Sequence, residues 1–239
     1  MENTVLIIAA LLTSTLSAMI GMGGGIILLG LMAMLIPHGY IVIALHGMIQ
    51  LIGNGTRTYV FKNAIKKEIV TKYFSGSLIG LSISSIIVLI LIHLYNVETA
   101  NEIRFDYLKP LIGIYIIWFI YLRKKNQSDK SGNFFLVGII GGLTSIFIGA
   151  VGPLIAPFFL RDQLTKENII ANKAACQIIT HLGKVPIFVY FFNLNYFEYS
   201  TILIPLMISV YIGTNIGKKL LGYIPEKTFK MVFKISLTI

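Results

Sequence analysis

The sequence predicts an all-α polytopic membrane protein with two four-segment repeats, which are expected to be inverted and each to begin with a broken or re-entrant helix. Three observations support this fold class. Hydrophobic residues make up 56% of the 239 positions and charged residues only 13%, which is too apolar for a soluble globule. Two long apolar runs, 5–36 and 134–160, are interrupted by glycine. Landmark residues also recur in the same order in the two halves of the chain.

The first apolar run is interrupted by the stretch Gly21-Met22-Gly23-Gly24-Gly25. Because glycine disfavours a continuous helix, the run is predicted to form a helix, a break and a second helix. A helix that begins at a break presents unpaired backbone N–H groups, which favour anions. Gly23, Gly24 and Gly25 are therefore candidate binding residues. The alternative is that these glycines only permit tight helix packing.

The next segment, 41–61, is predicted to be a helix with one polar face. It carries His46, Gln50, Asn54 and Arg57 at spacings of four, four and three residues, which place their side chains along one side. That side is expected to contact protein or water rather than lipid. Gln50, Asn54 and Arg57 join the candidate binding residues.

The rest of the first half alternates charged loops with apolar helices. A basic loop at 62–72 precedes a helix at 73–95, and an acidic loop at 98–106 precedes a helix at 108–122. Gly76 and Gly80 are four residues apart in the first of these helices, a spacing that favours close helix packing.

A polar stretch at 126–133 is predicted to be a cytoplasmic linker between a first membrane repeat, 1–125, and a second, 134–239. The second repeat is expected to contain, in order, a broken run at 134–160, helices near 169–192 and 199–221, and a short apolar tail.

An ordered series of matching positions indicates that the two halves arose by internal duplication. A shift of 128 residues places Gly21 on Gly149 and Gly24 on Gly152. A shift of 127 residues matches three polar positions: Gln50 with Gln177, Asn54 with His181, and Arg57 with Lys184. The duplication adds Gly152, Gln177, His181 and Lys184 to the candidate binding residues.

The charged loops distinguish two membrane topologies. If each broken run crosses once, the basic segment 218–230 falls outside, against the tendency of basic loops to be cytoplasmic. If each run enters and returns, the basic segments 62–72, 123–130 and 218–230 all fall inside, and the acidic 98–106 falls outside. The second topology is favoured, although steeply tilted broken helices would also accommodate the length of the runs.

Buried positive charge is the strongest indication of a ligand. All ten acidic residues lie in or beside predicted loops, whereas Arg57 and Lys184 lie within apolar helices. A centrally placed Arg or Lys costs about 2.5–3.5 kcal/mol on insertion scales, so an anion or water is expected nearby. Arg57 has an alternative, since its side chain could extend toward the membrane surface near Lys62. The neutral donors Gln50, Asn54, Gln177 and His181 suit an oxyanion, but each could instead join two helices.

Other functional classes find little support in the sequence. Cys176 is the single cysteine, which excludes a disulfide within one chain and any paired-thiol metal motif. The four histidines are dispersed, so we predict no metal site and no cofactor. No nucleophile, base and acid set suggests an enzyme. The Lys and Arg residues lie in short loops between apolar tracts, which favours contact with lipid headgroups rather than nucleic acid.

Several motifs resemble the sulfite exporter TauE/SafE family over nearly the whole chain. They are Gly21-Met22-Gly23-Gly24-Gly25-Ile26-Ile27, the helix around Asn54 and Arg57, the run from Gly149-Ala150-Val151-Gly152-Pro153 to Phe159, Ala171-Asn172-Lys173, and His181-Leu182-Gly183-Lys184. The resemblance implies a permease for sulfite or small organosulfonate anions. The segment 227–239 has only thirteen residues, looks shorter than the family's closing helix, and is not expected to span the membrane.

The function predicted from these observations is export of sulfite or an organosulfonate across the plasma membrane by a multi-pass permease. An inside-negative potential would favour outward movement of an anion. The alternatives are a non-transporting membrane subunit that binds a partner helix or lipid headgroup, and an importer or channel for another small oxyanion. The expected partners are the lipid bilayer and the anion, and a homo-oligomer is left open.

Overall fold

The structure is a computed structural model, which describes residues 2–103, 110, 114, 133–160 and 163–236. The described residues form helices, turns and loops and contain no strand, which confirms the all-helical class. The helices are α1 (Glu2–Ile20), α2 (Gly24–Leu35), α3 (Gly39–Val60), α4 (Lys67–Tyr95), α6 (Phe134–Ser145), α7 (Gly152–Ile155), α8 (Lys166–Phe191), α9 (Ser200–Leu221) and α10 (Glu226–Ser236). Nearly all of the helix expected at 108–122 and of the linker expected at 126–133 lies outside the described residues.

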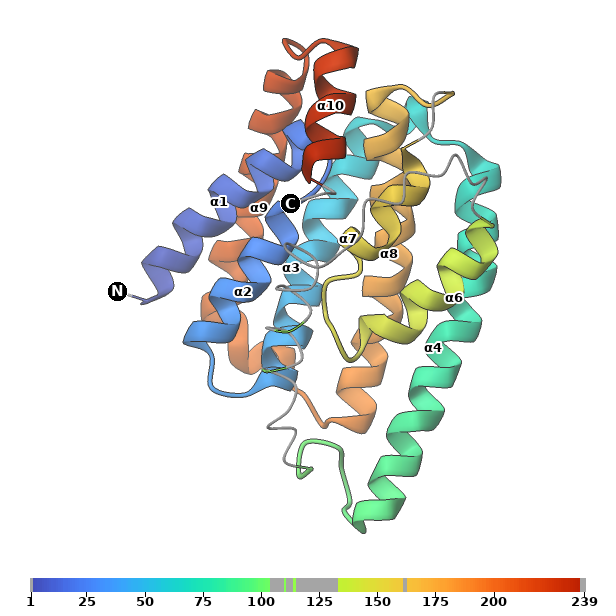
Figure 1. Ribbon diagram of the computed structural model, residues 1–239. Coiled ribbons are helices and arrows are strands. Elements are labelled where there is room, and N and C mark those ends of the chain that lie inside the picture. The colour runs from blue at the N-terminus through green and yellow to red at the C-terminus, as the bar shows by residue number, and fades with distance from the viewer. Residues whose placement is uncertain (1, 104–109, 111–113, 115–132, 161–162, 237–239) are drawn as a thin grey trace.

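The first broken run has the predicted helix, break and helix. Gly21 and Gly23 have φ angles of 85° and 95°, a left-handed conformation that glycine adopts without the steric cost of a side chain. The chain reverses there, so that α1 and α2 form a hairpin (Figure 1).

The second broken run also bends at a glycine, but its second arm is short. Gly149 has a φ of 84°. The four-residue helix α7 follows, and a 3-10 turn, Ala156–Phe159, continues it. Pro153 lies in the first turn of α7, where proline is tolerated, but Pro157 lacks the backbone N–H that would continue the α-helix.

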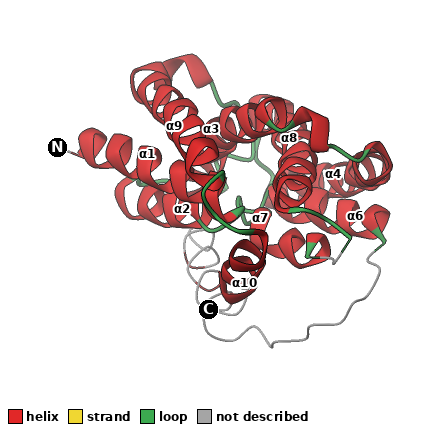
Figure 2. Cartoon of the chain, turned by 90° about the horizontal axis from the view of Figure 1, so that it is seen from above, coloured by secondary structure: helices red, strands yellow, loops and turns green. Residues whose placement is uncertain are grey.

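The long helices α3 and α8 lie antiparallel at the centre of the molecule. Near the end of α3, the backbone N–H of Lys66 donates to Oδ1 of Asn172 in α8, at 2.7 Å. Near the start of α3, the ring of Tyr40 stacks on that of Phe192, with centroids 5.8 Å apart. Figure 2 shows α1, α2 and α9 on one side of this pair and α4 and α6 on the other.

The flanking helices pack in two close pairs that each combine the two halves of the chain. Gly76 and Gly80 of α4 lie against the backbone of α6, and Gly213 and Gly217 of α9 lie against α1. A side chain at any of these four positions would collide with the facing helix. All four glycines therefore serve helix packing, as predicted for Gly76 and Gly80. The inversion of the repeats and their boundaries stay predictions.

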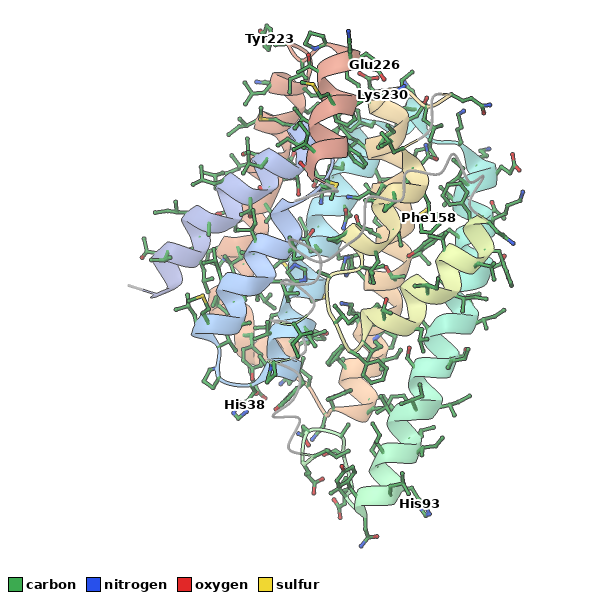
Figure 3. All side chains as sticks on the ribbon, viewed as in Figure 1. His38, His93, Phe158, Tyr223, Glu226 and Lys230 are labelled. Atoms are coloured by element: carbon green, nitrogen blue, oxygen red, sulfur yellow. The ribbon has the colours of Figure 1, made fainter. Side chains whose placement is uncertain are left out.

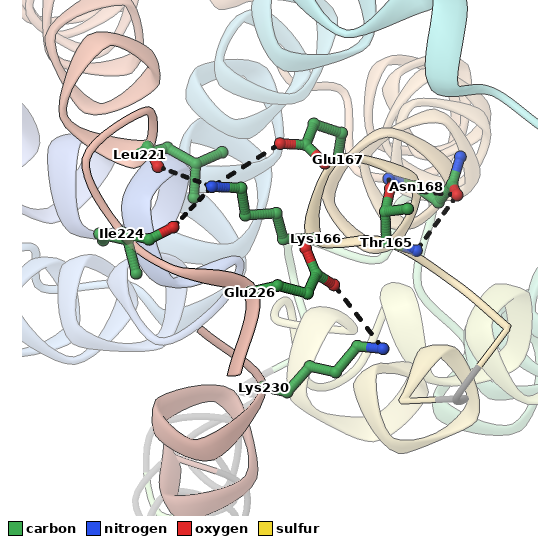
Figure 4. Close-up of polar contacts among 8 residues, drawn as sticks. All are labelled: Thr165, Lys166, Glu167, Asn168, Leu221, Ile224, Glu226 and Lys230. Atoms are coloured by element: carbon green, nitrogen blue, oxygen red, sulfur yellow. Dashed lines mark hydrogen bonds and ion pairs between the residues drawn. The ribbon is translucent and has the colours of Figure 1, made fainter. Parts of the chain in front are cut away.

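Three helical segments of the described chain are long and apolar enough to cross a bilayer, namely Lys67–Tyr95, Lys166–Phe191 and Tyr196–Leu221. The eleven residues of α10 are far fewer than the ~20 that a crossing requires. This helix instead packs inward through Phe229 and Phe233, which are both buried. Figure 4 shows how its start is held: Nζ of Lys166 donates to the carbonyl oxygens of Leu221 and Ile224, at 3.1 and 2.6 Å.

The two ends of the molecule differ in charge. Four segments lie together at one end: the end of α3, the starts of α4 and α8, and the α9–α10 connection. Nζ of Lys218 lies 5.9 Å from the ring centroid of Phe61, Nζ of Lys166 donates to the Ile224 carbonyl, and the N–H of Lys66 donates to Asn172. We call this the basic end; it carries lysines 62, 66, 67, 166, 218, 219, 227 and 230. The opposite end carries the 96–103 loop, which joins the end of α8 where the N–H of Ala100 donates to the Phe191 carbonyl. In Figure 3, Glu226 and Lys230 mark the basic end, and His38 and His93 mark the opposite end.

Candidate functional site

A cavity lies between the two glycine bends and the central helices α3 and α8. It is small: the space that the centre of a water-sized molecule can occupy is about 20 Å³. Its polar and glycine lining consists of Ser17, Gly23, Gly25, His46, Gln50, Arg57, Gly152, Lys173, Gln177 and His181. Seven of the ten residues predicted from the sequence are in this lining. Gly24, Asn54 and Lys184 are not.

The three consecutive glycines of the first bend have different surroundings. Gly23 precedes α2 in its left-handed conformation. Gly24 lies so close to Thr13 and Ser17 of α1 that a Cβ there would collide with the Thr13 carbonyl, so Gly24 serves helix packing. Gly25 faces Gln50, whose Nε2 would lie 3.3 Å from a Cβ at that position. Only Gly23 and Gly25 therefore border the cavity.

The second bend repeats the last of these arrangements. A Cβ on Gly152 would lie 2.9 Å from Nε2 of Gln177. Gly152 with Gln177 thus matches Gly25 with Gln50, so Gly25, and not Gly24 as the sequence comparison suggested, is the structural counterpart of Gly152. The helix N-terminus predicted at Gly152 can attract an anion only weakly, because α7 has only four residues.

Two polar stripes face the cavity, one on α3 and one on α8. Each has four members at spacings of four, four and three residues: His46, Gln50, Asn54 and Arg57, and Lys173, Gln177, His181 and Lys184. Because the helices are antiparallel, Arg57 lies at the level of Lys173 and His46 lies at the level of Lys184.

Arg57 is buried, with 5% of its surface exposed, so its side chain does not extend to the surface as the alternative proposed. Its Nε donates to the carbonyl of Gly53 at 3.1 Å, and its Nη2 donates to Oδ1 of Asn54 at 3.0 Å. A longer contact of 3.4 Å joins Nη2 to Oε1 of Gln50. Asn54 therefore orients the guanidinium rather than lining the cavity.

Two buried lysines of α8 each donate to the carbonyl of a glycine bend. Nζ of Lys173 lies 2.5 Å from the Gly21 oxygen, and Nζ of Lys184 lies 3.2 Å from the Gly149 oxygen. The exposed fractions of these lysines are 5% and 0%. No carboxylate of the described residues forms an ion pair with either lysine or with Arg57.

Lys173 and His46 line the cavity but were missed as site residues. The signal was present in the sequence, since the shift of 127 residues that matches Gln50 with Gln177 also matches His46 with Lys173. The match is difficult to see because histidine and lysine are unlike residues, although each is the first member of the polar stripe on its own helix.

Two histidines, His46 and His181, lie one helical turn from the glutamines, on the side toward the opposite end. Nε2 of His46 lies 2.8 Å from the Gly25 carbonyl, which can only accept, so this nitrogen carries a proton. The ring centroid of His181 lies 6.4 Å from that of His46. Both ring nitrogens of His181 are buried and have no hydrogen-bond partner among the described residues. Because burying an unpaired polar group is costly, a polar ligand or water is expected there.

Among known proteins, one family model, described as "Sulfite exporter TauE/SafE", matches residues 6–239. No curated protein and no solved structure matches the chain. The family match covers both glycine bends, both polar stripes and every helix but the first turn of α1. The chain therefore belongs to the sulfite exporter TauE/SafE family of membrane transporters.

Proposed function

We propose that this protein exports a small sulfur oxyanion, sulfite or an organosulfonate, across the cell membrane as a multi-pass permease. The observation that carries the proposal is the pair of buried cations, Arg57 and Lys173, in the lining of one cavity with no described carboxylate to neutralise them. Such uncompensated charge within apolar helices marks an anion pathway.

Each lining group has a role in this proposal. Arg57 and Lys173 supply the charge, and a guanidinium can donate two parallel hydrogen bonds to an oxyanion. Gln50, Gln177 and His181 add neutral donors. Gly25 and Gly152 leave room for the glutamine side chains to reach the ligand.

The charge of the two ends supports an orientation. Basic segments favour the cytoplasmic side, so we place the basic end inside and the opposite end, which carries Glu98, Glu102 and Glu198, outside. The segments 62–72 and 218–230 then share the cytoplasmic side, as inverted repeats with re-entrant first runs require. An inside-negative potential favours outward movement of each negative charge by about 2.3 kcal/mol per 100 mV.

The test is efflux of sulfite, and separately of a sulfonate, from proteoliposomes that contain the purified protein. We expect Arg57→Gln and Lys173→Gln to reduce efflux by about 10- to 100-fold, the loss for one charged hydrogen bond. Lys72→Gln is the matched control, since Lys72 is an exposed lysine of α4. Size-exclusion profiles show whether each variant stays folded. Wild-type efflux of both anions equal to that of empty liposomes would refute the proposal.

A further inference from the structure

We propose that Lys184, His46 and His181 form a second oxyanion subsite, nearer the opposite end than the Arg57–Lys173 pair. This inference rests on the proposed function and adds to it a second position for the anion on its path. Four observations support it, and none of them requires Lys184 to line the cavity in this conformation.

The first observation is the matched arrangement of the two stripes. The antiparallel packing of α3 and α8 sets the last residue of one stripe beside the first residue of the other, at both ends. One such meeting is Arg57 with Lys173. The other is His46 with Lys184, so the same geometry that brings Arg57 beside Lys173 also brings His46 beside Lys184.

The second observation is that both lysines hold a bend in the same way. Lys173 donates to the carbonyl of Gly21 and Lys184 to that of Gly149, and both glycines have positive φ. A lysine ammonium has three N–H donors, and this carbonyl is the one hydrogen-bond partner of Lys184 among the described residues. Two donors of Lys184 therefore remain for a ligand.

The third observation is that the chain makes room for the lysine. A Cβ on Gly47 of α3 would lie 3.0 Å from Cδ and 3.5 Å from Nζ of Lys184. A side chain at position 47 would therefore press on the methylene groups that carry the ammonium of Lys184. Gly47 thus leaves space on α3 for the charged side chain of Lys184, which a larger residue at this position would fill.

The fourth observation points to a missing ligand. His181 is 1% exposed and lines the cavity, and neither of its ring nitrogens has a partner in the described part of the chain. Its ring lies edge-on to that of His46. A small oxyanion at this level would accept from both the imidazole and the Lys184 ammonium.

The two subsites are separated along α8 and differ in charge. Eleven residues at 1.5 Å each place Lys173 and Lys184 about 16 Å apart along the helix. The inner subsite has two full cations, while the outer one has a single cation and two imidazoles. The outer subsite should therefore hold an anion more weakly, which favours release toward the opposite end.

The test compares entry from the two faces. Initial rates of sulfite uptake are measured in right-side-out and inside-out vesicles, with vesicles from cells that lack the protein as background. In Lys184→Gln, we expect the half-saturating sulfite concentration to rise about tenfold at the outer face and less than about threefold at the inner face. Lys173→Gln should show the reverse pattern, and Lys72→Gln should match wild type at both faces.

Each outcome bears on a separate claim. The second subsite is overturned if Lys184→Gln has the same half-saturating sulfite concentration as the wild type at both faces. It is also overturned if this concentration rises equally at both faces, and in either case the transport function stands. If Lys184→Gln does not fold, His46→Gln is measured in the same way, and an outer-face increase of about threefold or more supports the subsite. No increase there overturns it. If the wild type takes up neither sulfite nor a sulfonate in vesicles of either orientation, the proposed function itself is refuted.

Discussion

The two glycine bends differ in their surroundings although their central geometry agrees. At each bend a glycine with φ near 85° offers its carbonyl to a lysine of α8. Gly21 is covered by the rings of Phe229 and Phe233 from α10, whereas Gly149 is covered by Leu29 and Ile43 from α2 and α3. The first bend thus depends on a peripheral helix, and the second on the central bundle.

The difference explains why the first bend needs more glycines. Gly24 is required because α2 folds back tightly on α1. At the second bend only the four-residue α7 and a 3-10 turn follow within the described run to residue 160, and Ala150 and Val151 lie between the two glycines. Gly25 and Gly152 also have a shared role, which is to accommodate a glutamine. The first bend is therefore rich in glycine mainly for its backbone conformation and helix packing. Gly23 and Gly25 border the cavity there, and Gly152 borders it at the second bend.

Among variants that test the difference between the two bends, the largest effect is expected for Gly24→Ala. Its Cβ would overlap a backbone carbonyl of α1, which cannot move without opening the hairpin. We expect a loss of about 3 kcal/mol or more in the free energy of unfolding, measured by chemical denaturation in detergent. Gly55→Ala is the matched control, because nothing lies within 4 Å of a Cβ there. Equal stability of the two variants would show that α1 and α2 do not form this close hairpin.

A second large effect is expected at α10. Phe233 is fully buried against Gly21, and truncating a buried Phe typically costs about 3–5 kcal/mol. An eleven-residue helix is marginal alone, so Phe233→Ala should release α10 from the first bend. We expect amide hydrogen exchange in 226–236 to accelerate about 100-fold, while 149–152 is unchanged.

The control for α10 is Met231→Ala, which alters an exposed side chain of the same helix. Its exchange rates should match those of the wild type. If 226–236 keeps its protection in Phe233→Ala, the first bend does not depend on α10, and the contrast between the two bends is lost.

Much of the fold was predictable because apolar length and glycine placement are local signals. The helical class, the break at 21–25 and the packing roles of Gly76 and Gly80 follow from such signals. The short second arm was not predicted. Helix length after Gly152 depends on Pro157 and on tertiary contacts that an apolar run does not encode.

The site was predicted in part, and the errors have a common cause. The polar stripe on α3 and the burial of Arg57 and Lys184 could be read from helical periodicity. Which stripe residue faces the cavity could not, because that depends on the rotation of α8 against α3. Lys184 turns to Gly149 and Asn54 turns to Arg57, while Lys173, which was noted only within a family motif, borders the cavity.

The smallest effects are expected for the two glutamines, which test how far the bends are equivalent. Gln50 and Gln177 face matching glycines, but only Gln50 is also within 3.4 Å of Nη2 of Arg57. Gln50→Ala should therefore raise the half-saturating sulfite concentration by about tenfold and Gln177→Ala by about threefold, within the range of one hydrogen bond. Proteoliposome efflux measures both, and Asn215→Ala on α9 is the control, since its side-chain amide donates to the Tyr211 carbonyl of the same helix. A larger effect at Gln177 would mean that the second bend, rather than the Arg57 side, dominates recognition of the anion.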